Sequence, residues 1–161
     1  MDDKDKSQTF QTPELVVTET GSYVPEQQAY LNLVRTSQEL GQQVSDLLAK
    51  HSLSGKQYNA LRAIRRGGTE GTGISQINDQ MTDPRADVTR LVDRLVRDGL
   101  VERQHDDHDR RVVKAYLTAK GDELLNLLDE PMLLTHRNQL KGLSQPEIKQ
   151  LILLLQKARG A

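Results

Sequence analysis

The chain has 161 residues, a formal net charge of −1 and no cysteine, which excludes a disulfide scaffold, a cysteine zinc site and a thiol redox sensor. Its apolar runs are shorter than the roughly 18 residues of a membrane span, and its charged N-terminus lacks the apolar core of a signal peptide. We therefore expect a cytoplasmic protein without membrane contact. One Phe and no Trp leave the core to aliphatic side chains, which favours helices.

The first half of the chain predicts a tail followed by helices. Residues 1–24 are polar and predict a flexible tail. Over residues 26–50, apolar residues recur at helical spacing and predict a first helix. Ser54 and Gln57 have the spacing of a capping box, so a second helix is expected to begin there and to end at Gly67-Gly68.

Two further helices are predicted in the middle of the chain. After a glycine-rich link at residues 71–73, a short helix is expected to bury Ile74, Ile77 and Met81. Asp83 is a good N-cap and Pro84 suits the first helical position, so the next helix is predicted from Pro84 to about Asp98. The apolar stripe of that helix contains Val88, Leu91, Val92 and Leu95.

The hydrophobic period then changes from that of a helix to that of strands. Residues 100–103 and 112–117 predict two short strands, and the polar stretch between them predicts a hairpin with a charged tip. Thr118 is expected to cap a following helix, which Pro131 should kink or break. A last helix is predicted after the capping box of Ser144 and Glu147. Its expected buried positions are Ile148, Leu151, Ile152 and Leu155.

This order of elements predicts a mainly α fold with a small β-hairpin wing. A short helix, a turn, a longer helix and a hairpin follow one another as in a winged helix-turn-helix domain, which we assign to residues 52–118. Residues 26–50 and 119–159 then form N- and C-terminal dimerisation helices, because their leucines exceed what one small protomer can bury. The alternative for these leucines is an ordinary helical core. In the predicted organisation, residues 25–161 form one folded unit and residues 1–24 its tail.

The helix predicted from Pro84 has an arginine-rich outer face. Its members are Arg85, Ala86, Thr89, Arg90, Asp93, Arg94 and Arg97. Arginine suits both bidentate contact to guanine and contact to phosphate, so this face predicts DNA reading. The alternative is a solvated helix face on which Asp93 pairs with Arg90 and Arg97.

The expected hairpin tip adds a second basic feature. Arg110 and Arg111 are adjacent at the tip and can enter a minor groove, with Asp109 fixing their orientation or merely solubilising the turn. Between Arg85 and Lys114, eight Lys or Arg residues face seven Asp or Glu residues. This near-neutral balance limits non-specific affinity and predicts a site-selective DNA binder.

Four motifs together resemble the MarR family of bacterial regulators over about residues 30–159. They are Asp87 to Leu95, Gly99 to Arg103, Asp109 to Val113, and Leu117 to Gly121. The resemblance implies a helical homodimer with a recognition helix in the major groove and a wing in the minor groove of double-stranded DNA. It places Arg85, Thr89, Arg90 and Arg94 in the recognition helix, Asp109, Arg110 and Arg111 at the wing tip, and Ser75 and Gln76 near phosphate.

The resemblance also bears on an effector. Regulators of this kind often respond to small phenolic or anionic compounds. Tyr30, Tyr58 and His51 have polar edges suited to such a compound, but each is more often a core or surface residue, so no ligand site is assigned.

The function predicted is a sequence-specific DNA-binding regulator, a repressor by default, that reads an inverted repeat as a homodimer. The alternative is a winged-helix protein-interaction module or antirepressor without DNA binding. His105 and His108, with neighbouring aspartates, offer metal ligands, but a flexible turn seldom fixes tetrahedral geometry, so neither a metal nor a cofactor is expected. The chain lacks the nucleotide-binding and hydrolase motifs, so an enzyme is not expected.

Overall fold

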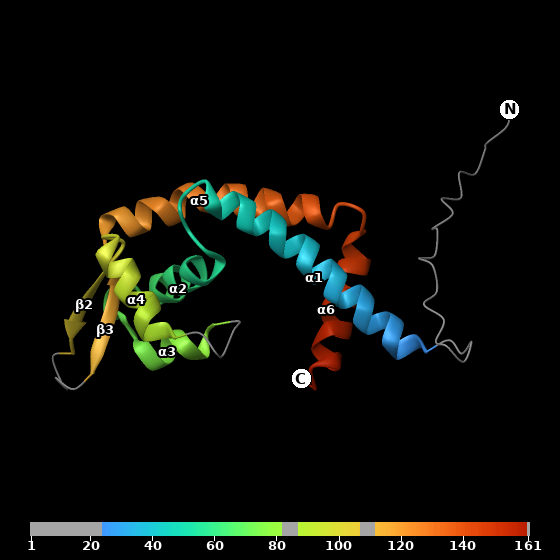
Figure 1. Cartoon of the computed structure of the whole chain (residues 1–161), viewed down its shortest axis with the longest axis horizontal. Helices are drawn as coiled ribbons and strands as arrows, with labels where there is room; N and C mark the ends of the chain where they lie inside the picture. The colour runs from blue at the N-terminus through green and yellow to red at the C-terminus, as the bar shows by residue number, and fades with distance from the viewer. Residues whose placement is uncertain (1–23, 82–86, 107–111, 161) are drawn as a thin grey trace, which may run out of the picture. The chain divides into compact units, whose positions relative to one another are not determined.

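The computed structural model describes residues 24–81, 87–106 and 112–160 (Figure 1). The chain divides into two compact units, one up to Leu40 and one from Gly41 onwards. Helix α1 (Pro25–Ala49) begins in the first unit and ends in the second. The remaining described elements lie in the second unit: α2 (Gly55–Arg66), the 3-10 turn η1 (Gly68–Glu70), β1 (Thr72–Gly73), α3 (Ile74–Asp79), α4 (Val88–Arg97), β2 (Val101–His105), β3 (Val113–Leu117), α5 (Ala119–Gln139) and α6 (Gln145–Ala158).

Helix α2 begins at the predicted capping box. The Gln57 amide donates to Ser54 Oγ at 3.2 Å, and the Ser54 amide donates to Gln57 Oε1 at 2.9 Å. Two N–H groups that the helix itself leaves unpaired are thereby satisfied. Gly67 then serves as the C-cap, as expected from its position.

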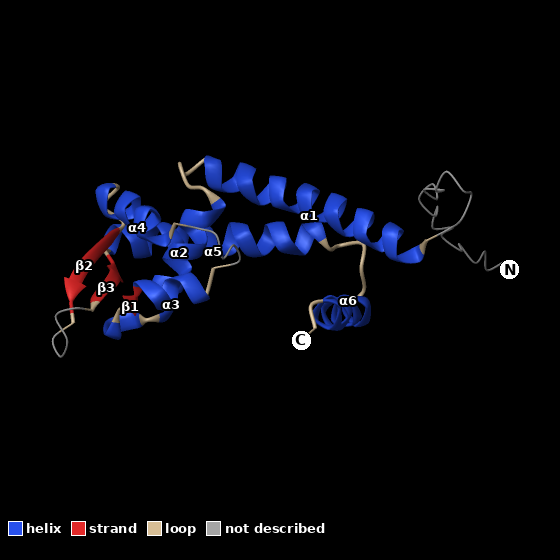
Figure 2. Cartoon of the chain, turned by 60° about the horizontal axis from the view of Figure 1, so that its bottom comes forward, coloured by secondary structure: helices blue, strands red, loops and turns tan. Residues whose placement is uncertain are grey.

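The sheet has three antiparallel strands in the order β1-β3-β2, which Figure 2 draws in red (Figure 2). The hairpin of β2 and β3 confirms the predicted pair of strands, with Val101 opposite Leu117 and His105 opposite Val113. Strand β1 was predicted as a glycine-rich link, and this was wrong. Thr72 pairs with Ala115 of β3, and its buried hydroxyl donates to the Ile64 carbonyl at 3.3 Å. The strand therefore joins the sheet to the end of α2.

Helix α4 begins at Val88, later than the predicted start at Pro84. Its N-cap is Asp87, whose Oδ1 accepts a hydrogen bond from the Arg90 amide at 3.1 Å. Asp83 and Pro84 lie outside the described residues. The backbone of Asp87, at φ −73° and ψ 84°, is not helical, so the helix does not run unbroken from Pro84. The predicted buried stripe is confirmed, since Val88, Leu91, Val92 and Leu95 are all buried.

The end of α4 is fastened to the start of α5 by side chains and backbone. Lys120 Nζ donates to the Asp98 carbonyl at 2.8 Å, and Thr118 Oγ1 donates to the Gly99 carbonyl at 2.8 Å. The Thr118 amide donates to the Leu100 carbonyl at 3.1 Å. These bonds satisfy carbonyls that a helix end leaves without partners. Thr118 Oγ1 also accepts from the Gly121 amide, which confirms Thr118 as the N-cap of α5.

Of the kink or break predicted at Pro131, the break does not occur, because α5 continues through this residue. A proline at this position removes the N–H that would bond the Leu127 carbonyl. Leu127 itself is 60% exposed, so this missing bond lies in a part of α5 that is not buried in the core. Thr135 Oγ1 adds a hydrogen bond to the Pro131 carbonyl at 2.9 Å within the same helix.

Helix α6 begins at the predicted capping box, where the Ser144 amide donates to Glu147 Oε2 at 2.7 Å. The prediction that this helix buries Ile148, Leu151, Ile152 and Leu155 was wrong for a single chain. Ile152 is 49% exposed and the other three are only partly covered. On the same helix Leu153 and Leu154 are 65% and 55% exposed. The apolar positions of α6 are therefore covered only in part within the described residues of one chain.

The core of the second unit is aliphatic, as the composition predicts. Its largest fully buried side chains are Leu48, Leu61, Ile64, Ile77, Leu95, Leu125, Leu128, Val92 and Val101. They come from α1, α2, α3, α4, α5 and β2, so one cluster joins all these elements. The core holds the outer face of α4 towards solvent, because the opposite face is buried in it.

Candidate nucleic-acid interface

The outer face of α4 carries three of the predicted DNA-reading residues. Thr89, Arg90 and Arg94 are all exposed, and the Arg90 side chain retains 81% of its accessible surface. The position of these residues opposite the buried stripe follows from the helical period of the sequence. Arg85, the fourth residue predicted on this helix, lies outside the described residues.

Two arginines of α4 are paired with aspartates at the ends of the helix. Arg90 Nε lies 3.1 Å from Asp87 Oδ2, while the same carboxylate caps the helix through the Arg90 amide. Arg97 Nε lies 3.8 Å from Asp98 Oδ1. Both contacts are exposed, so water and salt screen them strongly. An incoming phosphate can therefore compete with the aspartates for either arginine.

Asp93 pairs with Arg103 of β2, at 2.5 Å between Oδ1 and Nη1. The alternative interpretation, in which Asp93 pairs with Arg90 and Arg97 along the helix, was therefore wrong. Arg94 has no ion-pair partner among the described residues. On the outer face of α4, Arg94 thus has no ion-pair partner among the described residues, whereas Asp93 is paired with an arginine of the sheet.

The helix before α4 presents the two residues predicted near phosphate. Ser75 and Gln76 are both exposed on α3. Gln76 Oε1 accepts a hydrogen bond from the Gly73 amide at 2.9 Å, so the side chain holds the start of its own helix. Its NH₂ group can still donate to another acceptor. Nearby, Arg66 Nη1 donates to Gln80 Oε1 at 2.8 Å and ties α2 to the end of α3.

An ion pair crosses the hairpin where β2 ends and β3 begins. Lys114 Nζ lies 2.7 Å from Asp106 Oδ2, and this hydrogen bond raises the pKa of Lys114 above its ordinary value. The Asp106 amide donates to the Val112 carbonyl at 2.9 Å, which extends the pairing beyond the strands. Asp109, Arg110 and Arg111, predicted at the tip, lie outside the described residues.

Arg103, whose guanidinium reaches from the sheet to α4, was not predicted as a site residue from the sequence. Its partner Asp93 lies ten residues earlier, and no local pattern links the two. The only available signal was strand alternation, which places Arg103 on the same side as the buried Val101.

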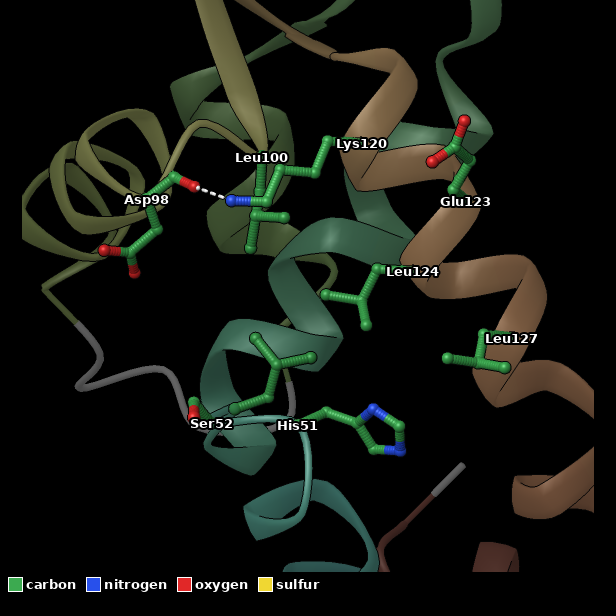
Figure 3. A pocket seen from close by; sticks show the side chains of 9 residues that line it. His51, Ser52, Asp98, Leu100, Lys120, Glu123, Leu124 and Leu127 are labelled. Carbon is green, nitrogen blue, oxygen red and sulfur yellow. Dashed lines mark hydrogen bonds between the residues drawn. The ribbon is translucent and has the colours of Figure 1, made fainter.

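A hollow of about 430 Å³ lies between the α1–α2 turn and the start of α5 (Figure 3). Leu53, Leu100, Leu124 and Leu127 contribute apolar lining, and His51, Ser52, Asp98, Lys120 and Glu123 contribute polar groups. Figure 3 shows the Lys120 amino group turned towards the Asp98 carbonyl, to which it donates. His51 is one of the three residues proposed from the sequence as a lining group. Tyr58 is buried in the core instead, and Tyr30 is 65% exposed on α1.

Comparison with known proteins identifies the family. A MarR family model matches residues 51–112. The HTH-type transcriptional regulator YkoM of Bacillus subtilis is 32% identical over 109 residues, which cover 68% of this chain and 70% of YkoM. The crystal structure of a MarR transcription factor from Planctomyces limnophilus is 38% identical and has a TM-score of 0.64, covering 84% of this chain and 98% of that one. The chain belongs to the MarR family.

A third comparison concerns the fold of this MarR-family regulator. BpsR of Bordetella bronchiseptica is 24% identical and has a TM-score of 0.76, covering 88% of this chain and 99% of that one. The DNA binding of BpsR is regulated by 6-hydroxynicotinic acid. The predicted family and the predicted winged-helix fold class are thus both confirmed. Within the described residues no helix combines the length and apolar character needed to cross a membrane, and no cluster of three metal-binding side chains occurs.

Proposed function

We propose that this MarR-family regulator is a sequence-specific DNA-binding repressor, with α4 in the major groove and the β2–β3 hairpin in the minor groove. The observation that carries the proposal is the outer face of α4. There Arg94 is uncompensated among the described residues, Arg90 is held only by an exposed pair, and Thr89 leaves room beside them. Arginine forks and a small hydroxyl side chain are the groups that read base edges.

The remaining proposed contacts follow from the same placement of α4 and the hairpin on DNA. Ser75 and Gln76 of α3 contact phosphate, and Arg85 is a further DNA contact. Arg110 and Arg111 enter the minor groove, where Asp109 orients them. Residues 52–118 form the reading head in this proposal, residues 26–50 and 119–159 form the dimerisation helices, and residues 1–24 form a tail.

The proposed assembly is a homodimer that reads an inverted repeat with half-sites about 10 base pairs apart. The support comes from the apolar surface of α6, where Ile152, Leu153 and Leu154 are 49%, 65% and 55% exposed. On α5, Leu133 and Leu134 are also 43% and 46% exposed. Several large apolar side chains exposed on the terminal helices are typical of a protein interface. Analytical centrifugation that finds a monomer at micromolar concentration would rule out the dimer.

A small phenolic or anionic effector completes the proposal by releasing the repressor from DNA. The hollow beside His51 and Lys120 offers nitrogen groups for an anion and leucines for an aromatic ring. Because 6-hydroxynicotinic acid regulates DNA binding of BpsR, that compound is the probe with which to begin. Calorimetric titration measures whether the compound binds the protein, and a mobility-shift assay measures whether it releases the protein from DNA. If neither measurement changes with this compound or with related hydroxylated aromatic acids, the proposed effector response is refuted.

The decisive experiment measures binding to DNA upstream of the protein's own gene by mobility shift. The wild type is compared with an Arg90→Ala, Arg94→Ala variant and with a separate Arg110→Ala variant. We expect both variants to bind more weakly, and wild-type binding to weaken steeply as salt rises. Equal binding by all three proteins would contradict the contact assignment. Absence of salt-dependent DNA binding would favour the alternative of a protein-interaction module or antirepressor.

A further inference from the structure

Arg103 is placed on the face of the sheet that packs towards α4. It is the middle residue of β2, and its side chain points to the same side as the buried Val101. Ala115, which lies directly opposite on β3, is fully buried and small, so the arginine stem has room to lie across the sheet. The Arg103 side chain retains only 30% of its accessible surface. A long cationic side chain is therefore held between sheet and helix.

The guanidinium of Arg103 has two anchor points on α4. Nη1 contacts Asp93 Oδ1, and Nη2 donates to the Thr89 carbonyl at 3.1 Å. Thr89 and Asp93 are four residues apart, which is about one helical turn. A rigid planar fork that spans one turn restrains both the rotation of α4 about its own axis and its position along that axis. A single point contact would restrain neither.

The position of Arg103 also has an energetic penalty that an arginine exposed to water would not have. Arg103 Nε is buried and has no hydrogen-bond partner among the described residues. An unsatisfied buried donor is unfavourable, so the fork is held in place against this penalty. The pair also offsets the negative charge of Asp93, whose side chain is 54% exposed beside Arg90, Arg94 and Arg97. Without Arg103, that carboxylate would repel phosphate from the proposed reading face.

We propose that Arg103 is a positioning residue for DNA reading: it orients α4 and neutralises Asp93 without itself touching DNA. This role rests on the proposed function of α4. It differs from that of Arg94, which is proposed to contact DNA directly. The two roles make different predictions for salt dependence, because only a phosphate contact releases counterions when it forms.

The test compares binding to two duplexes of equal length, the one that the wild type protects in footprinting and a scrambled one, over a range of salt. For Arg103→Met, which keeps the stem, we expect a loss of about tenfold in the ratio of the two affinities, as for one misaligned base contact. The slope of affinity against salt should stay as in the wild type. Arg94→Ala should instead lower that slope by about one.

A second variant separates positioning from charge. Arg103→Lys keeps the charge, but one ammonium group cannot span both anchor points, so we expect it to lose discrimination as Arg103→Met does. Circular dichroism and thermal unfolding verify that each variant is folded at the assay temperature. If Arg103→Met does not fold, Arg103→Lys alone decides the question.

Three outcomes overturn the role of Arg103. Unchanged discrimination in a folded Arg103→Lys variant makes the fork unnecessary. A salt slope lowered by about one in Arg103→Met makes the residue a phosphate contact. Wild-type protein that binds neither duplex refutes the proposed function and this role with it, whereas the first two outcomes leave the proposed function intact.

Discussion

Arg65 of α2 and Asp129 of α5 form a bidentate ion pair across two helices of the second unit. Nη1 donates to Oδ2 at 2.8 Å and Nη2 donates to Oδ1 at 2.7 Å. Asn126, one turn earlier on α5, accepts a longer contact of 3.5 Å from the same guanidinium. Parallel hydrogen bonds of this kind hold both position and orientation. The pair therefore fastens α5 to the helix that precedes the proposed reading elements.

Replacing Asp129 by Asn should lower the free energy of unfolding by about 0.5–1 kcal/mol at neutral pH, a value kept small because the aspartate side chain is 47% exposed. The hydrogen bond from Arg65 lowers the pKa of Asp129 in the folded state. The stabilisation is therefore complete above the ordinary aspartate value of about 3.9 and is lost as pH falls through the lowered pKa. Urea unfolding of both proteins between pH 7 and pH 3 measures the difference.

Glu130→Gln is the matched control for this prediction. Glu130 is the next residue on α5, is exposed and has no ion-pair partner in the described part of the chain. The substitution should leave unfolding at pH 7 nearly unchanged. Equal effects of the two substitutions at pH 7 would show that the Arg65 pair does not stabilise the fold.

Gly121→Ala should destabilise the protein by about 1–3 kcal/mol or more, as overpacking of a close contact does. A Cβ atom at Gly121 would lie 2.1 Å from the Leu100 carbonyl oxygen, which is backbone and cannot turn aside. Gly41→Ala is the control, because a Cβ there would meet no atom within 4 Å inside α1. Alanine in a helix interior should raise stability by about 0.5–1 kcal/mol. Thermal unfolding that shows the same sign for both variants would contradict this packing.

Two serines in the α1–α2 turn should respond oppositely to substitution. Ser52 has a φ of 57°, a left-handed conformation that glycine adopts without strain, so Ser52→Gly should stabilise by about 0.5–1 kcal/mol. Ser54 caps α2 through the Gln57 amide, so Ser54→Ala should cost about 1 kcal/mol. Chemical unfolding at pH 7 measures both. A loss of stability in Ser52→Gly would refute the strain attributed to that residue.

Replacing Leu153 and Leu154 by Ser should weaken the proposed dimer while each protomer remains helical. Both side chains are more than half exposed in one chain, so their loss opens no cavity in the core. Each leucine that becomes fully buried between protomers contributes about 1.5–3 kcal/mol to association. Sedimentation velocity at decreasing concentration measures the shift, with Lys149→Ser as a control on the exposed polar surface of α6. If the variant dimer dissociates at the same concentration as the wild type, Leu153 and Leu154 do not lie in the dimer interface.

Features with local causes were predictable from the sequence. The capping boxes at Ser54 and Ser144 depend on contacts between residues three apart, and both form as predicted. The buried stripe of α4 depends only on the helical period. The start of α4 was not predictable in the same way, because Asp83 and Asp87 both suit an N-cap and local signals do not choose between them.

Features with distant causes were missed. Strand β1 has two residues, and it is a strand because β3 provides an edge for Thr72 and Gly73. The burial expected on α6 does not occur within one chain, where Ile152 is 49% exposed, because periodicity marks apolar positions but not what covers them. In the candidate site, Thr89, Arg90 and Arg94 were found from their helix face, whereas the pairing of Asp93 with Arg103 requires the sheet and helix to be packed first.

The junction of α4 and α5 also determines how the molecule opens locally. Thr118 and Lys120 bond the carbonyls of residues 98–100, so the last turn of α4 cannot fray while the start of α5 stays folded. Elements coupled in this way exchange their amide hydrogens in a single cooperative event. The two helices should then share one opening free energy in native-state hydrogen exchange, so that α4 is as long-lived as α5.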